Sequence, residues 1–140
     1  MTSLFSVTFD ASFRTKEDEE LSPPSGLCFT HEGNILLADD FNHRIQVYDP
    51  QLNLITSFGE KGKEQGQLQY PKGIAVDKEG NIFVADSWNH RIQKFDSQGK
   101  TLLSFGSCGE GKGELNEPYD ILIDSSGTLI VVERYNHRIQ

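Results

Sequence analysis

The chain has 140 residues, which is enough for one domain of ordinary size. Hydrophobic residues make up 36% and aromatic residues 10%, a composition typical of a folded chain rather than a disordered one. The 21 acidic residues outnumber the 13 lysines and arginines, so the net charge of −8 argues against indiscriminate binding to nucleic acid or anionic membranes. A local basic patch remains compatible with this balance. Thirteen glycines and five prolines favour many turns over long helices.

The first 22 residues differ in pattern from the rest of the chain. Residues 4–9 alternate apolar and polar side chains, as an isolated strand would, and the acidic stretch 16–20 is typical of a solvated linker. The N-terminus lacks the basic and apolar segments of a secretory signal, and no apolar run approaches the ~18 residues of a membrane span. Cys28 and Cys108 lie in unlike contexts, which predicts no disulfide framework. These features predict an intracellular, cytoplasmic protein without membrane contact.

A tandem repeat organises the remaining residues. The pentapeptide Asn-His-Arg-Ile-Gln occurs at 42–46, 89–93 and 136–140, so the spacing is 47 residues both times. Half of the positions in 24–59 are identical to those in 71–106. We therefore divide the chain into an N-terminal segment and a tandem array. The boundaries are 1–22 for that segment and 23–140 for the array, with units at about 23–66, 67–113 and 114–140.

Each complete unit predicts four short strands. In the middle unit these are 73–77, 81–86, 91–96 and 101–105, separated by turns that contain glycine, asparagine or aspartate. The first two strands are continuously apolar, which indicates burial on both faces, and the third alternates more. Four antiparallel strands of falling burial in a repeat of this length are typical of a β-propeller blade. The predicted fold is all-β, with about three blades, the last of them truncated.

These motifs carry a resemblance to a known family. The runs Pro-Lys-Gly-Ile-Ala-Val-Asp at 71–77, Gly-Asn-Ile-Phe-Val-Ala-Asp at 80–86 and Asn-His-Arg-Ile-Gln at 89–93 resemble the NHL repeat. The resemblance covers about 26–140 and implies a propeller that commonly has six blades. The first unit departs from it at Thr30, which replaces the aspartate at 77. The third departs at Asp120 and Glu133, which replace the glycine at 73 and the aspartate at 86.

Three units would form only part of such a ring and leave two blade faces open. Three explanations remain: the chain is a fragment of a larger propeller protein, it pairs with a second copy to complete the ring, or it stands as an open arc. In many propellers an N-terminal strand completes the last blade, and residues 4–9 resemble such a strand.

The repeated polar residues favour a structural role over a catalytic one. A catalytic group is needed once, whereas these residues recur in every unit, and the acidic residue stands close enough to the Asn to fix the loop by hydrogen bonds. We therefore predict no metal ligand and no catalytic residue among them, and no cofactor. The repeat set comprises Asp39, Asn42, His43, Arg44, Asp86, Asn89, His90, Arg91, Glu133, Asn136, His137 and Arg138.

Other residues are candidates for chemistry or binding. The run 106–113 is one residue short of a phosphate-binding loop, because Gly113 stands where Ser or Thr would bind magnesium, and we interpret it as a connection between blades. Cys108 is interpreted as an unreactive exposed thiol. Repeated aromatic residues precede each Asn-His-Arg and either pack between blades or anchor a partner. The candidate partner-binding residues are Lys61, Lys63, Lys72, Lys112, Phe41, Trp88 and Tyr135.

Three functions compete. The first is non-catalytic recognition of a protein partner, since the resemblance extends to the C-terminal propellers of tripartite-motif ubiquitin ligases, which recruit substrates. Any ligase activity would need RING sequence that this stretch lacks. The alternative is binding of single-stranded RNA, which is disfavoured because acidic residues are interleaved with the lysines. The third is a metal-dependent, lyase-like propeller enzyme, for which no histidine and carboxylate set stands out from the repeat.

Overall fold

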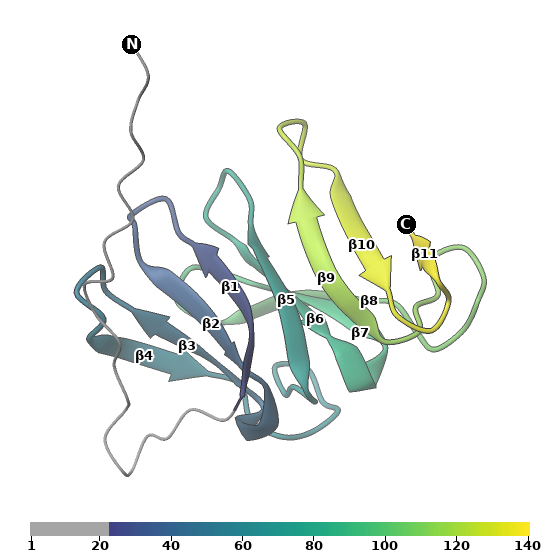
Figure 1. Ribbon diagram of the computed structural model, residues 1–140, viewed down its shortest axis with the longest axis horizontal. Helices are drawn as coiled ribbons and strands as arrows, with labels where there is room; N and C mark the ends of the chain where they lie inside the picture. Colours follow the sequence, from purple (N-terminus) through teal and green to yellow (C-terminus); the bar gives the residue numbers. More distant parts are fainter. Residues whose placement is uncertain (1–22) are drawn as a thin grey trace, which may run out of the picture.

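The computed structural model describes residues 23–140, and the strand predicted at 4–9 and the acidic stretch at 16–20 lie outside this range. The described chain forms three antiparallel sheets that stand side by side, with the first strand of each nearest its neighbours (Figure 1). The first sheet contains β1 (Pro24–Phe29), β2 (Ile35–Asp39), β3 (Arg44–Tyr48) and β4 (Leu54–Phe58). The second contains β5 (Pro71–Val76), β6 (Ile82–Asp86), β7 (Arg91–Phe95) and β8 (Thr101–Phe105). The third contains β9 (Pro118–Ile123), β10 (Leu129–Glu133) and β11 (Arg138–Ile139).

Short turns with acidic or hydroxyl side chains join the first two strands of each sheet. Asp77 Oδ1 accepts hydrogen bonds from the backbone N–H groups of Glu79 at 3.1 Å and Asn81 at 2.8 Å. Gly80 has φ of 84°, a conformation that glycine adopts without strain. In the first unit Thr30 takes the place of the aspartate, and its Oγ1 accepts the Asn34 N–H at 3.1 Å. The hydroxyl thus preserves the turn where the sequence departs from the repeat.

Close backbone approach between neighbouring sheets requires glycine in the first strand. A Cβ placed on Gly26 would lie 1.9 Å from the carbonyl oxygen of Lys72, and one on Gly73 would lie 2.7 Å from the Cα of Asp120. The register of β1 against β2, and of β5 against β6, shifts around these glycines. Asp120 occupies the equivalent position of β9 and is exposed. The glycines therefore allow β1, β5 and β9 to pack against one another.

The apolar core lies between the sheets, in two clusters. Alternate residues of β5 point to opposite faces: Ile74 packs in the cluster shared with the first sheet, and Ala75 packs in the cluster shared with the third. The fully buried Ile45 and Ile92 occupy the same repeat position, one in each cluster. The continuous apolar runs predicted from the sequence are thus explained by burial on both faces.

Burial falls from the inner to the outer strands in the middle sheet, as predicted. Most residues of β5 are buried, whereas β8 has none that is fully buried. Strands β1 and β9 are more exposed than β5, because each has a neighbouring sheet on only one side within residues 23–140. The fold is therefore a partial β-propeller with two four-stranded blades and one three-stranded blade, in agreement with the predicted fold class. No helix among the described residues is long and apolar enough to cross a membrane.

Candidate recognition surface

The repeated acidic residue is the centre of a buried hydrogen-bond network in every blade. In the second blade the Asp86 carboxylate accepts hydrogen bonds from Arg91 Nε at 2.7 Å and Asn89 Nδ2 at 2.9 Å. The same contacts join Arg44 to Asp39 at 2.8 Å. They also join Asn42 to Asp39 at 3.0 and 3.1 Å, Arg138 to Glu133 at 2.6 Å, and Asn136 to Glu133 at 2.7 Å. The hydrogen bonds expected between the acidic residue and the Asn are present in all three blades.

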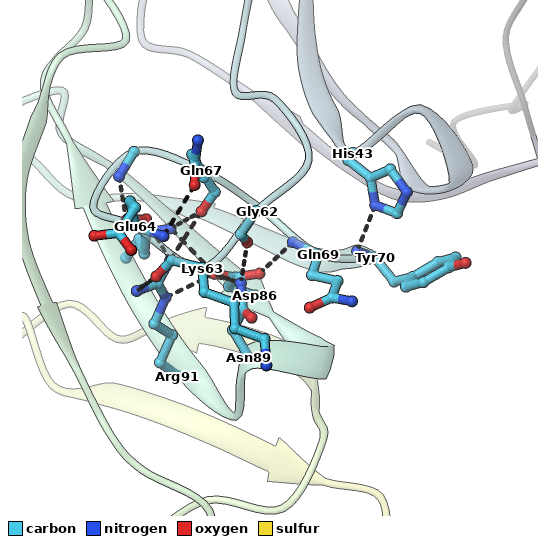
Figure 2. Close-up of polar contacts among 12 residues, drawn as sticks. His43, Gly62, Lys63, Glu64, Gln67, Gln69, Tyr70, Asp86, Asn89 and Arg91 are labelled. Atoms are coloured by element: carbon cyan, nitrogen blue, oxygen red, sulfur yellow. Dashed lines mark hydrogen bonds and ion pairs between the residues drawn. The ribbon is translucent and has the colours of Figure 1, made fainter.

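The motif arginine fastens the loop that arrives from the preceding blade. The Arg91 guanidinium donates to the carbonyl oxygens of Lys63 at 2.8 Å, Glu64 at 2.8 Å and Gln67 at 2.9 Å (Figure 2). The Gln69 N–H in turn donates to Asp86 Oδ1 at 2.6 Å. Arg138 makes the same set of contacts in the third blade, to carbonyl oxygens of Glu110, Gly111 and Glu114. The network therefore connects blades as well as shaping one turn.

The electrostatics of the buried acids depend on how much protein surrounds them. Burial raises the pKa of Asp86, although hydrogen bonds from Asn89, the Gln69 N–H and Arg91 favour its charged form. Burial acts in the same direction on Glu133, but hydrogen bonds from its neighbours outweigh it and lower the pKa. The third sheet has no further sheet beside it among residues 23–140, so desolvation is weaker there.

The motif histidines make contacts between blades. His43 Nδ1 accepts the backbone N–H of Tyr70 at 3.1 Å, and His90 Nδ1 accepts that of Glu117 at 3.2 Å. Burial lowers the pKa of His43, and the charge of Lys61 adds to this shift. In both contacts the Nδ1 atom is the hydrogen-bond acceptor. Among residues 23–140 no group of three or more His, Cys, Asp or Glu side chains could hold a metal ion.

The glycine-rich run 106–113 directs its backbone donors at protein acceptors. The N–H groups of Gly109 and Gly111 donate to the Leu115 carbonyl at 3.2 Å and to Glu114 Oε2 at 2.8 Å. The Gly113 N–H donates to the Gln140 side chain at 3.1 Å. These three N–H groups are thus engaged by acceptors within the loop and in the third blade.

The β2–β3 and β6–β7 turns lie at one end of the blades, the lower edge in Figure 1, and the units differ at some positions there. One repeat position holds Asp40, Ser87 and Arg134 in successive units. Because shared residues specify the common fold, these variable positions are where unit-specific binding would be encoded. An open pocket of about 300 Å³ lies at this end of the blades, and we call the residues that line it the aromatic surface. They are Asp40, Phe41, Tyr70, Lys72, Trp88, Glu117 and Arg134.

Three aromatic rings form a contiguous group on the aromatic surface. The ring of Tyr70 lies 5.4 Å from that of Phe41 and 4.3 Å from that of Trp88, measured between centroids. Phe41 is 57% exposed and Trp88 is 51% exposed, so both present apolar area to solvent. Tyr70 comes from the loop between the first and second blades and is not among the predicted binding residues. The equivalent residue of the next loop is Glu117, and this difference between the two units is the sequence feature that could have identified Tyr70.

The charges on the aromatic surface are paired with opposite charges. Lys72 Nζ forms an ion pair with Asp40 across the boundary between two blades, and Arg134 lies 3.8 Å from a Glu117 carboxylate oxygen. The Arg134 guanidinium also lies 5.2 Å from the ring centroid of Tyr135. The surface therefore combines aromatic area with nearly balanced charge.

The predicted binding residues do not all come together. Lys72 belongs to β5 and lines the pocket. Its ammonium group lies beside Asp40, near the start of β5. Lys61, Lys63 and Lys112 are exposed on the loops between blades, away from the pocket lining.

The remaining candidates, Tyr135 and Cys108, do not line the pocket. Tyr135 is 51% exposed, and its ring lies against Arg134, which lines the pocket. Cys28 and Cys108 are both free thiols, the first half-buried and the second exposed. Burial raises the pKa of the Cys28 thiol, which disfavours the reactive thiolate.

Comparison with known proteins supports the NHL and propeller assignment. Residues 68–95 match the NHL repeat, and no curated protein matches the chain. A protein of unknown function from Bacteroides thetaiotaomicron has 19% identity and a TM-score of 0.72 over 86% of this chain and 36% of its own. Virginiamycin B lyase from Staphylococcus aureus has 13% identity and a TM-score of 0.64 over 83% and 36%.

A structural-genomics protein described as a gluconolactonase has 14% identity and a TM-score of 0.66 over 86% of this chain and 44% of its own. The chain thus spans less than half the length of each of these structures. At such low identity the likeness shows the fold alone. The second unit of the chain therefore matches the NHL repeat, within a chain that has the fold of a partial β-propeller.

Proposed function

We propose that the propeller segment is a non-catalytic recognition module that binds a protein segment on the aromatic surface, in the cytoplasm. The observation that carries the proposal is the contiguous group of Phe41, Tyr70 and Trp88, of which two rings are half-exposed. Tyrosine, tryptophan and arginine are the residues that dominate binding energy in protein interfaces. Arg134 lines the same pocket.

The charges favour a protein ligand over RNA. Each cation that lines the pocket faces a carboxylate, with Lys72 paired to Asp40 and Arg134 to Glu117. Phosphate backbones are bound through clusters of uncompensated positive charge. The rings could stack on bases, but the surface offers little of the charge that RNA binding needs.

More specifically, we propose that the bound protein segment belongs to a ubiquitin-ligase substrate, as in tripartite-motif proteins. Its support is the NHL match at residues 68–95 together with the aromatic surface. The surface is suited to binding rather than catalysis because its acidic side chains, Asp40 and Glu117, contact basic ones. Structural neighbours include a lyase, and the role proposed for this chain differs from that protein's.

A random-peptide display library, selected against the 140-residue chain, tests the proposal. We expect enriched peptides whose affinity falls at least tenfold in Trp88→Ala, because truncating an aromatic anchor removes about 2 kcal/mol or more of binding energy. Leu103→Ala is the matched control, since Leu103 is 44% exposed on β8, outside the pocket lining. The control should bind peptides as the wild type does.

Two results would contradict the proposal. One is a selection that enriches no peptide, or only peptides that bind Trp88→Ala unchanged. The other is retention of a random single-stranded RNA pool that weakens steeply with added salt, which would favour nucleic acid as the ligand.

A further inference from the structure

The aromatic surface contains a buried carboxylate oxygen that has no hydrogen-bond donor among residues 23–140. Asp40 is 2% exposed, and its Oδ2 atom is paired with Lys72 across the boundary between two blades. Its Oδ1 atom is buried as well and accepts no hydrogen bond from the described residues. A buried charged oxygen without a donor is unfavourable, so Oδ1 indicates a place for an N–H group that a ligand supplies.

The fold does not require a carboxylate at this position. The residue 47 positions after Asp40 is Ser87, which is 1% exposed, so the same place in the second blade is equally buried but neutral. Lys72 is likewise replaced, 47 positions later, by Tyr119. Burial of an ion pair gives little net stability compared with neutral packing. Binding therefore explains the acid at position 40 better than folding does.

Aromatic rings stand beside this carboxylate. Phe41 follows Asp40 directly, and Tyr70 and Trp88 line the same pocket. The ring planes of Tyr70 and Trp88 are inclined at 46°, and that of Phe41 is nearly perpendicular to Tyr70, at 89°. Rings at such angles present faces in several directions, and the face of an aromatic ring attracts cations. The pocket thus combines an acceptor for N–H groups with surfaces for a cation.

These two features together select the chemistry of the ligand. A quaternary ammonium group binds to ring faces but has no N–H group for Asp40 Oδ1. A primary ammonium group has N–H donors but no flat surface that stacks on a ring. A guanidinium group has both, because it is planar and carries its N–H donors at the edge. The net charge of −8 also favours a cationic ligand.

We propose that the aromatic surface binds an arginine side chain of its protein partner, with the guanidinium stacked on the Trp88 ring and an N–H donated to Asp40 Oδ1. This inference rests on the proposed function, since it names the side chain that the bound protein segment supplies. Lys72 gives access to Oδ1 by turning toward the ring of Tyr119, whose centroid lies 5.9 Å from its ammonium nitrogen.

The fluorescence of Trp88, which is the only tryptophan of the chain, tests the proposal. The probes are capped pentapeptides with one arginine, lysine or citrulline between glycines, titrated into the 140-residue chain. We expect saturable quenching by the arginine peptide. The uncharged citrulline peptide should bind about tenfold more weakly, because it lacks the cation–π contact and the charge-assisted hydrogen bond. The lysine peptide should also bind more weakly than the arginine peptide.

Three variants locate the bound guanidinium. Asp40→Ser, which introduces the residue of the second unit, should bind the arginine peptide about tenfold more weakly, with unchanged circular dichroism. Glu79→Ser is the matched control, because it removes an exposed carboxylate outside the aromatic surface and introduces the residue of the third unit. It should bind the peptide as the wild type does. Lys72→Gln should bind several-fold more tightly, because it removes the cation that competes for Asp40.

Three results would overturn this inference. Equal binding of the arginine peptide and either of the other two shows that the guanidinium is not recognised. Unchanged affinity in Asp40→Ser, or in Lys72→Gln, places the arginine elsewhere. The peptide display reads the proposed function separately, since enriched peptides that require Trp88 but contain no arginine would support that function and overturn this inference alone.

Discussion

The imidazole of His43 accepts the backbone N–H of Tyr70 at 3.1 Å, across the boundary between the first and second blades. Both residues have positive φ, 56° and 52°, so the contact joins two turns that L-amino acids adopt reluctantly. The Tyr70 ring also lies against His43, with 4.6 Å between centroids. One side chain thus holds the loop that presents the central ring of the aromatic surface.

Replacement of this imidazole should destabilise the fold. We expect His43→Ala to lower the free energy of unfolding by about 1–3 kcal/mol, because it leaves the Tyr70 N–H without its acceptor. His137→Ala is the control, since His137 is exposed and residues 23–140 supply no equivalent N–H to it. Urea denaturation measures both variants, and equal losses would contradict the assigned role of His43.

Stability should also depend on pH through His43. Burial, with a contribution from Lys61, lowers its pKa in the folded state, so the unfolded chain takes up the proton first, near the ordinary value of 6.5. The contribution of neutral His43 to the free energy of unfolding is therefore complete above about pH 6.5, and it is lost as the pH falls through the folded-state pKa. Unfolding free energies measured between about pH 7.5 and 5.5 should decline in the wild type and decline less in His43→Gln. An identical slope in the two proteins would contradict this assignment.

Loss of the motif arginine should be more costly than loss of any surface charge. Arg91→Ala removes the ion pair of the fully buried Asp86 and the donors to three loop carbonyls, and we expect a loss of about 3–5 kcal/mol. Arg91→Lys should recover only part of this, because one ammonium cannot span the same acceptors. Lys78→Ala, whose contact to Glu79 is 3.9 Å long and exposed, should change stability by about 0.5 kcal/mol or less. Thermal and urea unfolding compare the three, and a small effect of Arg91→Ala would refute the network's role.

The glycine at the contact between inner strands should resist substitution. Gly73→Ala places a Cβ 2.7 Å from the Cα of Asp120 and 2.8 Å from the Ile121 nitrogen, so the two strands must separate. We expect a loss of about 1–3 kcal/mol in urea denaturation. In Gly111→Ala the nearest atom, at 2.9 Å, belongs to the flexible Glu114 side chain, and the loss should be smaller. Equal effects would mean that backbone approach is not limiting.

The fold could be predicted from the sequence because of the repeat, whereas the aromatic surface could be predicted only in part. A spacing of 47 residues and the turn at 77–80 predicted the blades, because these features depend on local geometry that recurs in each unit. The hydrogen bond from Asn89 to Asp86 was predicted because the two residues lie in one turn. Contacts across blades were not, since they depend on how neighbouring sheets pack.

The ion pair between Lys72 and Asp40 illustrates that limit. The two residues are 32 positions apart and meet only because β5 starts beside the turn after β2. Neither residue recurs in the other units, so the repeat carries no information about the pair. Tyr70 was missed for the same reason, although its neighbours Phe41 and Trp88 were selected.

The contacts of Arg91 also set an order of events during synthesis. In the loop 59–70, the carbonyl oxygens of Lys63, Glu64 and Gln67 accept hydrogen bonds from Arg91, which follows them by 24 to 28 positions. The ribosome synthesises the chain from the N-terminus, so the loop cannot form these hydrogen bonds until Arg91 of the second blade has been synthesised. The second blade thus completes the loop that precedes it, and the aromatic surface is complete only after Trp88, Glu117 and Arg134 have been translated.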